Sequence, residues 1–156
     1  MPTVQTKKRG TAFIPENSNP TQERFINYLM KGGKKSVARK ILNDTMKIIS
    51  KKTSSDPEKI FKLALENVKP LMEVKPKRVG GAVYQIPLEV KAERQLALTF
   101  RWILAAARSK KGSPMRERLA TELIEASNGQ GIAIKKKTET ERMAQANKAF
   151  AHFAKY

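Results

Sequence analysis

The sequence predicts a mainly helical protein, a six-helix bundle with one projecting two-stranded β-hairpin. Two observations support this fold class. Apolar residues recur at three-and-four spacing in six segments, which is the helical period, whereas residues 72–90 alternate between apolar and polar positions as paired strands do. A chain of 156 residues divided between two domains would leave each with a small core. We therefore expect residues 19–156 to form a single domain.

The first three helices are indicated by the residues at their ends. The first begins at Asn19, a favourable N-cap, with Pro20 in the first helical position, and it ends at a pair of glycines. The second covers about residues 35–52. The third begins at Asp56, and Pro70 stops it because proline disfavours helical geometry in the residue before it.

The last three helices follow the hairpin. The fourth covers residues 92–108 and has the strongest apolar stripe in the chain. The fifth begins at Ser113 and ends near Gly129, a residue type that often follows the last helical turn. The sixth is expected to open at Thr138, because Glu141 lies three residues later as in a capping box. It should run nearly to the end of the chain.

The hairpin turn is predicted at Gly80 and Gly81, because a two-residue loop requires positive φ angles that glycine adopts freely. This turn pairs Val79 with Ala82. A proline in each strand removes one hydrogen bond from a sheet, which is tolerated only where both strands are edges. The hairpin should therefore be a two-stranded ribbon that projects from the helices.

The charge balance predicts a polyanionic partner. Lys and Arg number 32 against 14 Asp and Glu, a formal net charge of +18. Such a charge repels itself in a compact fold unless an acidic polymer neutralises it. No membrane partner is expected, since the longest apolar run, residues 102–107, is far shorter than a spanning helix. The N-terminus has no apolar core like that of a signal peptide, which favours a protein that stays inside the cell.

The sequence contains no constellation typical of an enzyme. There is no cysteine, which excludes disulfides, thiolate catalysis and sulfur-dependent zinc sites. The single histidine, His152, has no carboxylate at catalytic spacing and is interpreted as a packed residue. Residues 33–36 superficially resemble a nucleotide-binding loop, but the earlier glycine that such a loop requires is Tyr28. We expect no cofactor and no metal.

Several groups of basic residues are candidates for RNA contacts. Arg94, Arg101 and Arg108 share one face of the fourth helix, because a spacing of seven residues repeats the same helical position over about 21 Å. Three lysines, residues 135–137, precede the predicted start of the last helix, where free amides and the helix dipole favour a phosphate. The alternative for the three arginines is a solvated cationic face.

The hairpin and the N-terminal segment are also basic. Lys75, Lys77 and Arg78 lie on one strand of the hairpin, and a ribbon of this size fits a nucleic-acid groove, although charge also protects exposed strand edges. Residues 1–18 show no apolar period and carry a basic cluster, so we expect an extended arm that is disordered without a partner. The cluster consists of Lys7, Lys8 and Arg9.

Three stretches together resemble one protein family. They are residues 29–36 (LMKGGKKS), residues 79–87 (VGGAVYQIP) and residues 142–153 (RMAQANKAFAHF). They are similar to the bacterial-type small-subunit ribosomal protein seven family, and the likeness covers nearly the whole chain from about residue 20. Residues 1–18 are less arginine-rich than is usual for that family, and Pro76 and Ala82 replace residues that are more often polar.

The resemblance implies a six-helix bundle with a projecting hairpin. It implies binding to the 3′ major domain of 16S-type rRNA, nucleation of head assembly, and a position near exit-site tRNA and mRNA. The implied protein partners are small-subunit ribosomal proteins nine, eleven, thirteen and nineteen. The implied location is the small subunit of a cytoplasmic ribosome, and an organellar ribosome is also compatible with the sequence.

Site residues transfer to this chain by position. The resemblance implies rRNA contacts at Lys7, Lys8, Arg9, Lys34, Lys35, Lys75, Lys77, Arg78, Arg94, Arg101, Arg108, Lys110, Lys111, Lys135, Lys136 and Lys137. It implies proximity to tRNA or mRNA at Arg78, Gly80, Gly81 and Arg142.

Two other function classes are alternatives to this one. An architectural DNA-binding protein is the main alternative, since basic helices and a basic ribbon also suit a bent duplex. An RNA-modifying enzyme would require a glycine-rich cofactor loop after a strand or a polar catalytic pocket, and the only predicted strands form the hairpin.

Overall fold

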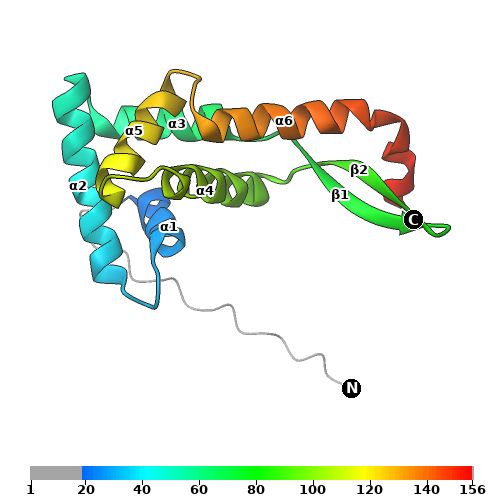
Figure 1. The fold of residues 1–156 in the computed structure, drawn as a ribbon, viewed down its shortest axis with the longest axis horizontal. Coiled ribbons are helices and arrows are strands. Elements are labelled where there is room, and N and C mark those ends of the chain that lie inside the picture. The colour runs from blue at the N-terminus through cyan, green and yellow to red at the C-terminus, as the bar shows by residue number, and fades with distance from the viewer. Residues whose placement is uncertain (1–18, 156) are drawn as a thin grey trace.

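A computed structural model describes residues 19–155, so residues 1–18, with the predicted basic arm, and Tyr156 lie outside the described part of the chain. Within that part, six α-helices and a short 3₁₀ helix, η1, accompany one antiparallel hairpin, which confirms the predicted fold class (Figure 1). The elements are α1 (Pro20–Leu29), α2 (Lys35–Thr53), α3 (Pro57–Val68), β1 (Met72–Val79), β2 (Ala82–Glu89), α4 (Ala92–Ser109), α5 (Met115–Ser127), α6 (Ile132–Ala146) and η1 (Lys148–Lys155).

The predicted starts of the first and third helices are confirmed. The side chain of Asn19 accepts a hydrogen bond of 3.0 Å from the Thr21 amide, and Asp56 accepts one of the same length from the Glu58 amide. Each cap satisfies an amide that has no partner inside the helix. Because the cap and the capped amide are two residues apart, both starts follow from local sequence.

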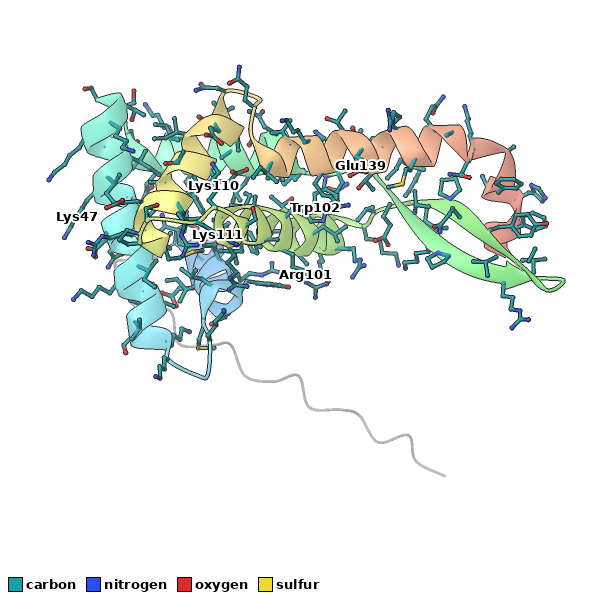
Figure 2. All side chains as sticks on the ribbon, viewed as in Figure 1. Lys47, Arg101, Trp102, Lys110, Lys111 and Glu139 are labelled. Carbon is teal, nitrogen blue, oxygen red and sulfur yellow. The ribbon has the colours of Figure 1, made fainter. Side chains whose placement is uncertain are left out.

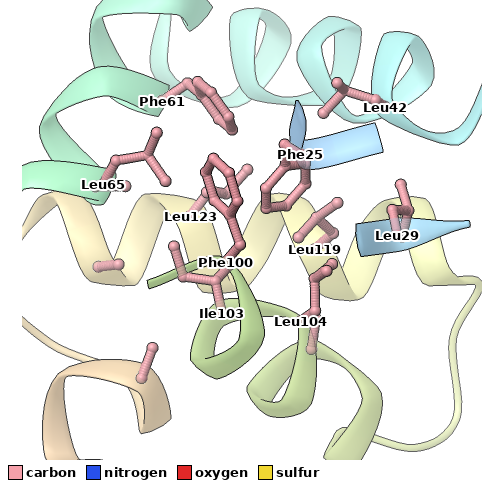
Figure 3. Close-up of a cluster of buried hydrophobic side chains, with 14 of the residues drawn as sticks. Phe25, Leu29, Leu42, Phe61, Leu65, Phe100, Ile103, Leu104, Leu119 and Leu123 are labelled. Carbon is pink, nitrogen blue, oxygen red and sulfur yellow. The ribbon is translucent and has the colours of Figure 1, made fainter. Parts of the chain in front are cut away.

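The core lies among α1 to α5 together with the start of α6, and it contains three phenylalanine rings (Figure 3). The Phe25 ring packs edge-on against Phe61 at 5.4 Å and against Phe100 at 5.3 Å, both preferred aromatic arrangements. The buried residues of α5, including the fully buried Leu119 and Leu123, pack against the same cluster. This core holds α4 in place, and α4 carries Arg94, Arg101 and Arg108.

The hairpin has the predicted turn and register. Val79 pairs with Ala82, and the φ angles of Gly80 and Gly81 are +58° and +89°. The two strands form the whole sheet in residues 19–155, so both are edges and accommodate their prolines. Figure 1 shows the ribbon extending away from the bundle.

The predicted start of the last helix is wrong. The helix begins at Ile132, and Thr138 lies inside it with its hydroxyl donating to the Ile134 carbonyl at 3.1 Å. Glu122 of α5 caps the true start, because its carboxylate accepts the Ala133 amide at 2.9 Å. Residues 135–137 are therefore part of the helix and do not precede it. The cap comes from another helix, so the local sequence motif indicated the wrong position.

The expectation that the last helix runs nearly to the end of the chain is also wrong. It ends at Ala146, and η1 turns back along the hairpin (Figure 1). The Tyr84 ring of β2 lies 5.1 Å from the Phe150 ring and 5.2 Å from the Phe153 ring. These contacts partly shield the three rings from solvent. The hairpin and η1 therefore form one packed projection.

None of the helices in residues 19–155 is both long enough and apolar enough to cross a lipid bilayer.

Candidate nucleic-acid interface

The arginine row, defined as Arg94, Arg101 and Arg108, lies on the exposed side of α4, and another element holds each side chain. Arg94 Nη2 lies 3.1 Å from Glu73 Oε2 of β1, and Arg108 Nη2 donates to the Leu29 carbonyl at 3.3 Å. The Arg101 guanidinium stacks 5.8 Å from the Tyr28 ring. Figure 2 shows Arg101 on the side of α4 away from α6. The row is partly ordered before any ligand binds, which lowers the entropic cost of binding.

Glu73 partly neutralises one end of this row. Its carboxylate is mostly buried and pairs with both Lys75, at 3.3 Å, and Arg94. Two cations thus share one anion, which leaves a net positive charge where the hairpin joins α4. Lys75 and Arg94, which sequence analysis assigned to different groups, belong to one cluster.

The loop before α2 presents a second basic region. Lys34 is exposed and forms no ion pair within residues 19–155, whereas Lys35 Nζ lies 3.4 Å from the buried Glu23 carboxylate. Arg39 pairs with the same carboxylate at 3.0 Å. No acidic residue lies in the first turn of α2 and no side chain caps it, so the positive end of the helix dipole adds to the charge of Lys34.

Lys110 and Lys111 are neighbours in sequence but differ in environment (Figure 2). Lys110 Nζ lies 3.0 Å from Glu122 Oε2 and 2.7 Å from Glu125 Oε2. Burial lowers the pKa of Lys110, but hydrogen bonds to Glu125 and Glu122 and the charges of both carboxylates outweigh it, so the pKa lies above its ordinary value. Lys111 is exposed and forms no ion pair with the described residues.

The lysines at residues 135–137 do not form the predicted cluster before a helix. Lys137 Nζ donates to the Asn67 carbonyl at 2.8 Å, and Lys136 pairs with Glu139 at 3.5 Å. Lys135 is exposed and lines a surface pocket together with Arg142. The phosphate site expected before Thr138 is therefore not at a helix start, and the carboxylate of Glu122 already occupies the true start of α6.

The hairpin cations also divide into internal and exposed groups. Lys77 Nζ donates to the Phe153 carbonyl at 3.3 Å, so this lysine links the ribbon to η1. Arg78 is exposed beside the turn and has no ion pair among residues 19–155. Arg78, Gly80 and Gly81 thus form the tip of the projection, as the sequence predicted.

Two cations were not among the predicted contacts. Lys31 and Arg118 line a small pocket with Lys34 and Arg108, and three separate segments supply these residues: the α1–α2 loop, α4 and α5. Lys31 lies close to Lys34 in sequence and was identifiable from the loop composition. No sequence pattern marked Arg118 as a candidate RNA contact, because it lies on a helix with both acidic and basic residues.

The described residues hold no arrangement typical of a catalytic or metal site. No group of three or more His, Asp or Glu side chains within residues 19–155 is positioned to bind a metal ion. His152 is exposed, so the interpretation of His152 as a packed, buried residue is wrong. Its ring does lie 4.0 Å from the Phe153 ring. Its Nδ1 lies 2.9 Å from the Ala149 carbonyl.

The family model described as Ribosomal protein S7p/S5e matches residues 2–148. The chain belongs to this family. A relative from Thermotoga maritima named Small ribosomal subunit protein uS7 is 55% identical over 149 residues, 96% of each chain. Relatives of the same name from Kosmotoga olearia and Thermodesulfovibrio yellowstonii are 53% and 48% identical, each over 94% of both chains. Membership in the S7p/S5e family confirms the resemblance found in the sequence and confirms that the chain is not an enzyme.

Proposed function

We propose that this protein is a structural constituent of the small ribosomal subunit that binds the 3′ major domain of 16S-type rRNA and nucleates assembly of the subunit head. The observation that carries the proposal is the arginine row, three exposed guanidinium groups held by Glu73, Tyr28 and Leu29 on a protein of net charge +18. Phosphate contacts supply a large share of RNA affinity, and a pre-ordered row meets successive phosphates at low entropic cost.

The proposed rRNA contacts extend from the arginine row to neighbouring elements. The α1–α2 loop with the start of α2, the hairpin, the α4–α5 loop, the exposed face of α6 and the N-terminal segment contribute the remaining cations. Lys35, Lys75, Lys77, Lys110 and Lys137 have partners inside the protein, so we assign them the role of shaping the surface and adding to its potential. Lys34, Lys111 and Lys135 are the exposed lysines proposed to meet phosphates directly.

The tip of the hairpin is proposed to contact a different ligand. Arg78, Gly80 and Gly81 lie at the end of the ribbon and Arg142 lies on α6, and these residues are assigned to the side of exit-site tRNA and mRNA. The proposed protein neighbours are small-subunit ribosomal proteins nine, eleven, thirteen and nineteen, in a cytoplasmic ribosome.

A competition experiment tests the proposal. The full-length protein is bound to a labelled transcript of the 3′ major domain at fixed ionic strength, and equal masses of unlabelled transcript or duplex DNA are added. The transcript should displace the label much more effectively, because rRNA offers folded single-stranded features as well as phosphates. Equal displacement by duplex DNA would favour the architectural DNA-binding alternative and overturn the proposal.

A further inference from the structure

A small groove lies beside the end of the arginine row, between the start of α2, the end of α4 and the start of α5. Its volume is about 270 Å³, below the usual range for pockets that hold drug-sized ligands, so it has room for a single small group. Its apolar lining residues, here called the floor, are Leu29, Val37, Ala38, Ile41 and Met115. Its cationic lining residues, here called the rim, are Lys31, Lys34, Arg108 and Arg118.

The charges around the groove are unbalanced. Its lining includes no acidic residue, and neither Lys31 nor Lys34 forms an ion pair with any residue in the range 19–155. Arg118 donates through Nη1 to the Lys110 carbonyl, but its Nε is buried without an acceptor in the described structure. The groove therefore combines an apolar floor with an electropositive rim.

A groove with an apolar floor and an electropositive rim favours some classes of ligand over others. An acidic side chain could pair with the rim cations, but it has no flat apolar face with which to cover the floor. An unpaired nucleotide has the opposite arrangement, since its flat base is flanked by phosphates. Bases in a duplex are stacked, so only an unpaired nucleotide has a base face free for the floor. The thioether of Met115 is polarisable and suits an aromatic ring.

We propose that this groove holds the base of one unpaired rRNA nucleotide while the rim cations contact its flanking phosphates. The inference rests on the proposed rRNA-binding function and adds the kind of RNA feature that is recognised. Arg108 belongs both to the arginine row and to the rim, so the phosphate contacts of α4 lead directly to the groove. The row then positions the RNA, and the groove recognises a nucleotide outside the duplex.

The test fills the groove without changing the charge. The Val37 side chain is 51% exposed, so Val37→Trp places a large ring over the floor with little effect on folding. Leu63→Trp is the matched control, because Leu63 is 47% exposed on α3 and does not line the groove. Circular dichroism melting verifies that both full-length variants are folded. Each protein is bound to the 3′ major-domain transcript, and dimethyl sulfate probing maps which unpaired bases are protected.

The wild-type protein should protect one unpaired base, and Val37→Trp should expose that base again. Val37→Trp should also bind about tenfold more weakly, within the range found when one base contact is lost. Leu63→Trp should match the wild type in both respects. Affinity of Val37→Trp equal to or above the wild type, or an unchanged protection pattern, would overturn the inference.

Two further outcomes have defined meanings. If Val37→Trp binds the transcript normally but assembled subunits lack a neighbouring protein, the groove binds protein and the inference is overturned. If the wild-type protein itself does not bind the transcript, the proposed function fails and the inference fails with it. If the wild-type protein binds the transcript, and Val37→Trp changes neither the affinity nor the protection pattern, then the inference fails while the proposed function stands.

Discussion

The carboxylate of Glu122 accepts a hydrogen bond of 2.9 Å from the backbone amide of Ala133, so a side chain of α5 caps the first turn of α6. Glu122 is fully buried, and its second oxygen lies 3.0 Å from Lys110 Nζ. Gly131, between the two helices, has a φ of +98°, and a Cβ atom there would lie 2.9 Å from Glu122 Oε1. The connection between α5 and α6 therefore depends on one carboxylate and on the lack of a side chain at residue 131.

Replacing Glu122 with alanine should destabilise the protein. The change leaves the buried Ala133 amide without its acceptor, which typically costs about 1–3 kcal/mol, while Lys110 keeps its pair with Glu125. Glu125→Ala is the matched control, because Glu125 also pairs with Lys110 but is 38% exposed, and it should cost about 1 kcal/mol or less. The measurement is the free energy of unfolding in urea. Equal losses for both variants would contradict the capping role of Glu122.

The Lys110 ion pair should contribute a pH-dependent part of the stability. Burial lowers the pKa of Lys110, but its hydrogen bonds and charge interactions with Glu125 and Glu122 raise it further, above the ordinary value of 10.5. A pKa raised by folding adds stability that is complete below the unfolded value and is lost as the pH rises through the folded value. The difference in melting temperature between the wild type and Lys110→Met should therefore be large at about pH 9 and smaller above the folded pKa.

Lys47→Met is the control for this pH experiment, because Lys47 is exposed and has no ion pair within residues 19–155. Its difference from the wild type should be small at both pH values. A Lys110→Met difference that stays constant with pH would show that lost packing, and not lost charge, causes the effect.

Reversing the charge of Arg101 should weaken rRNA binding more than the same change at Lys47. Arg101 is central in the arginine row on α4, whereas Lys47 lies on α2 (Figure 2). Arg101→Glu should also flatten the dependence of log affinity on log salt by about one counterion or more, since it removes a phosphate contact. The readout is filter binding at several salt concentrations. Equal losses with unchanged slopes would mean that the row is only a solvated face.

Shortening the hairpin should separate rRNA binding from the tRNA-side function. Deleting residues 78–83 and closing the strands with a new two-residue turn removes the tip but retains Tyr84 and its ring contacts. Affinity for the 3′ major domain should fall less than about tenfold, equivalent to about 1.4 kcal/mol, because most of the proposed phosphate contacts lie on the bundle. Subunits should assemble but hold exit-site tRNA more weakly. Loss of rRNA binding and of assembly would make the hairpin a primary rRNA anchor.

Replacing Tyr84 with alanine should loosen the projection while leaving the bundle intact. The Tyr84 ring contacts Phe150 and Phe153, which lie apart from the main core. Aromatic pairs contribute about 0.5–1.5 kcal/mol beyond burial, so amides of β1, β2 and η1 should exchange faster with deuterium while those of α4 and α5 do not. Val83→Ala, at a neighbouring exposed position, is the control and should change little. Faster exchange throughout the molecule would show that the ring cluster belongs to the core.

Elements with short-range signals could be predicted from the sequence. The starts of α1 and α3 followed from Asn19 and Asp56, each of which caps an amide two residues away. The hairpin register followed from Gly80 and Gly81, because a two-residue turn determines every pair behind it. The arginine row followed from helical spacing alone.

The start of α6, its early end and the groove were decided by tertiary structure. Glu122 caps α6 from another helix, the Tyr84 ring packs against the C-terminal rings, and Arg118 lines the groove with cations from two other segments, the α1–α2 loop and α4. In each case the partners lie far apart in sequence or on different elements, so no local period or motif predicts the interaction. The sequence by itself determined which segments are helical or extended and that the partner is a polyanion, because those properties depend on local spacing and total charge. The tertiary structure decided which cations are free to meet that partner, because pairing with a buried carboxylate or carbonyl depends on distances that only the packed chain creates.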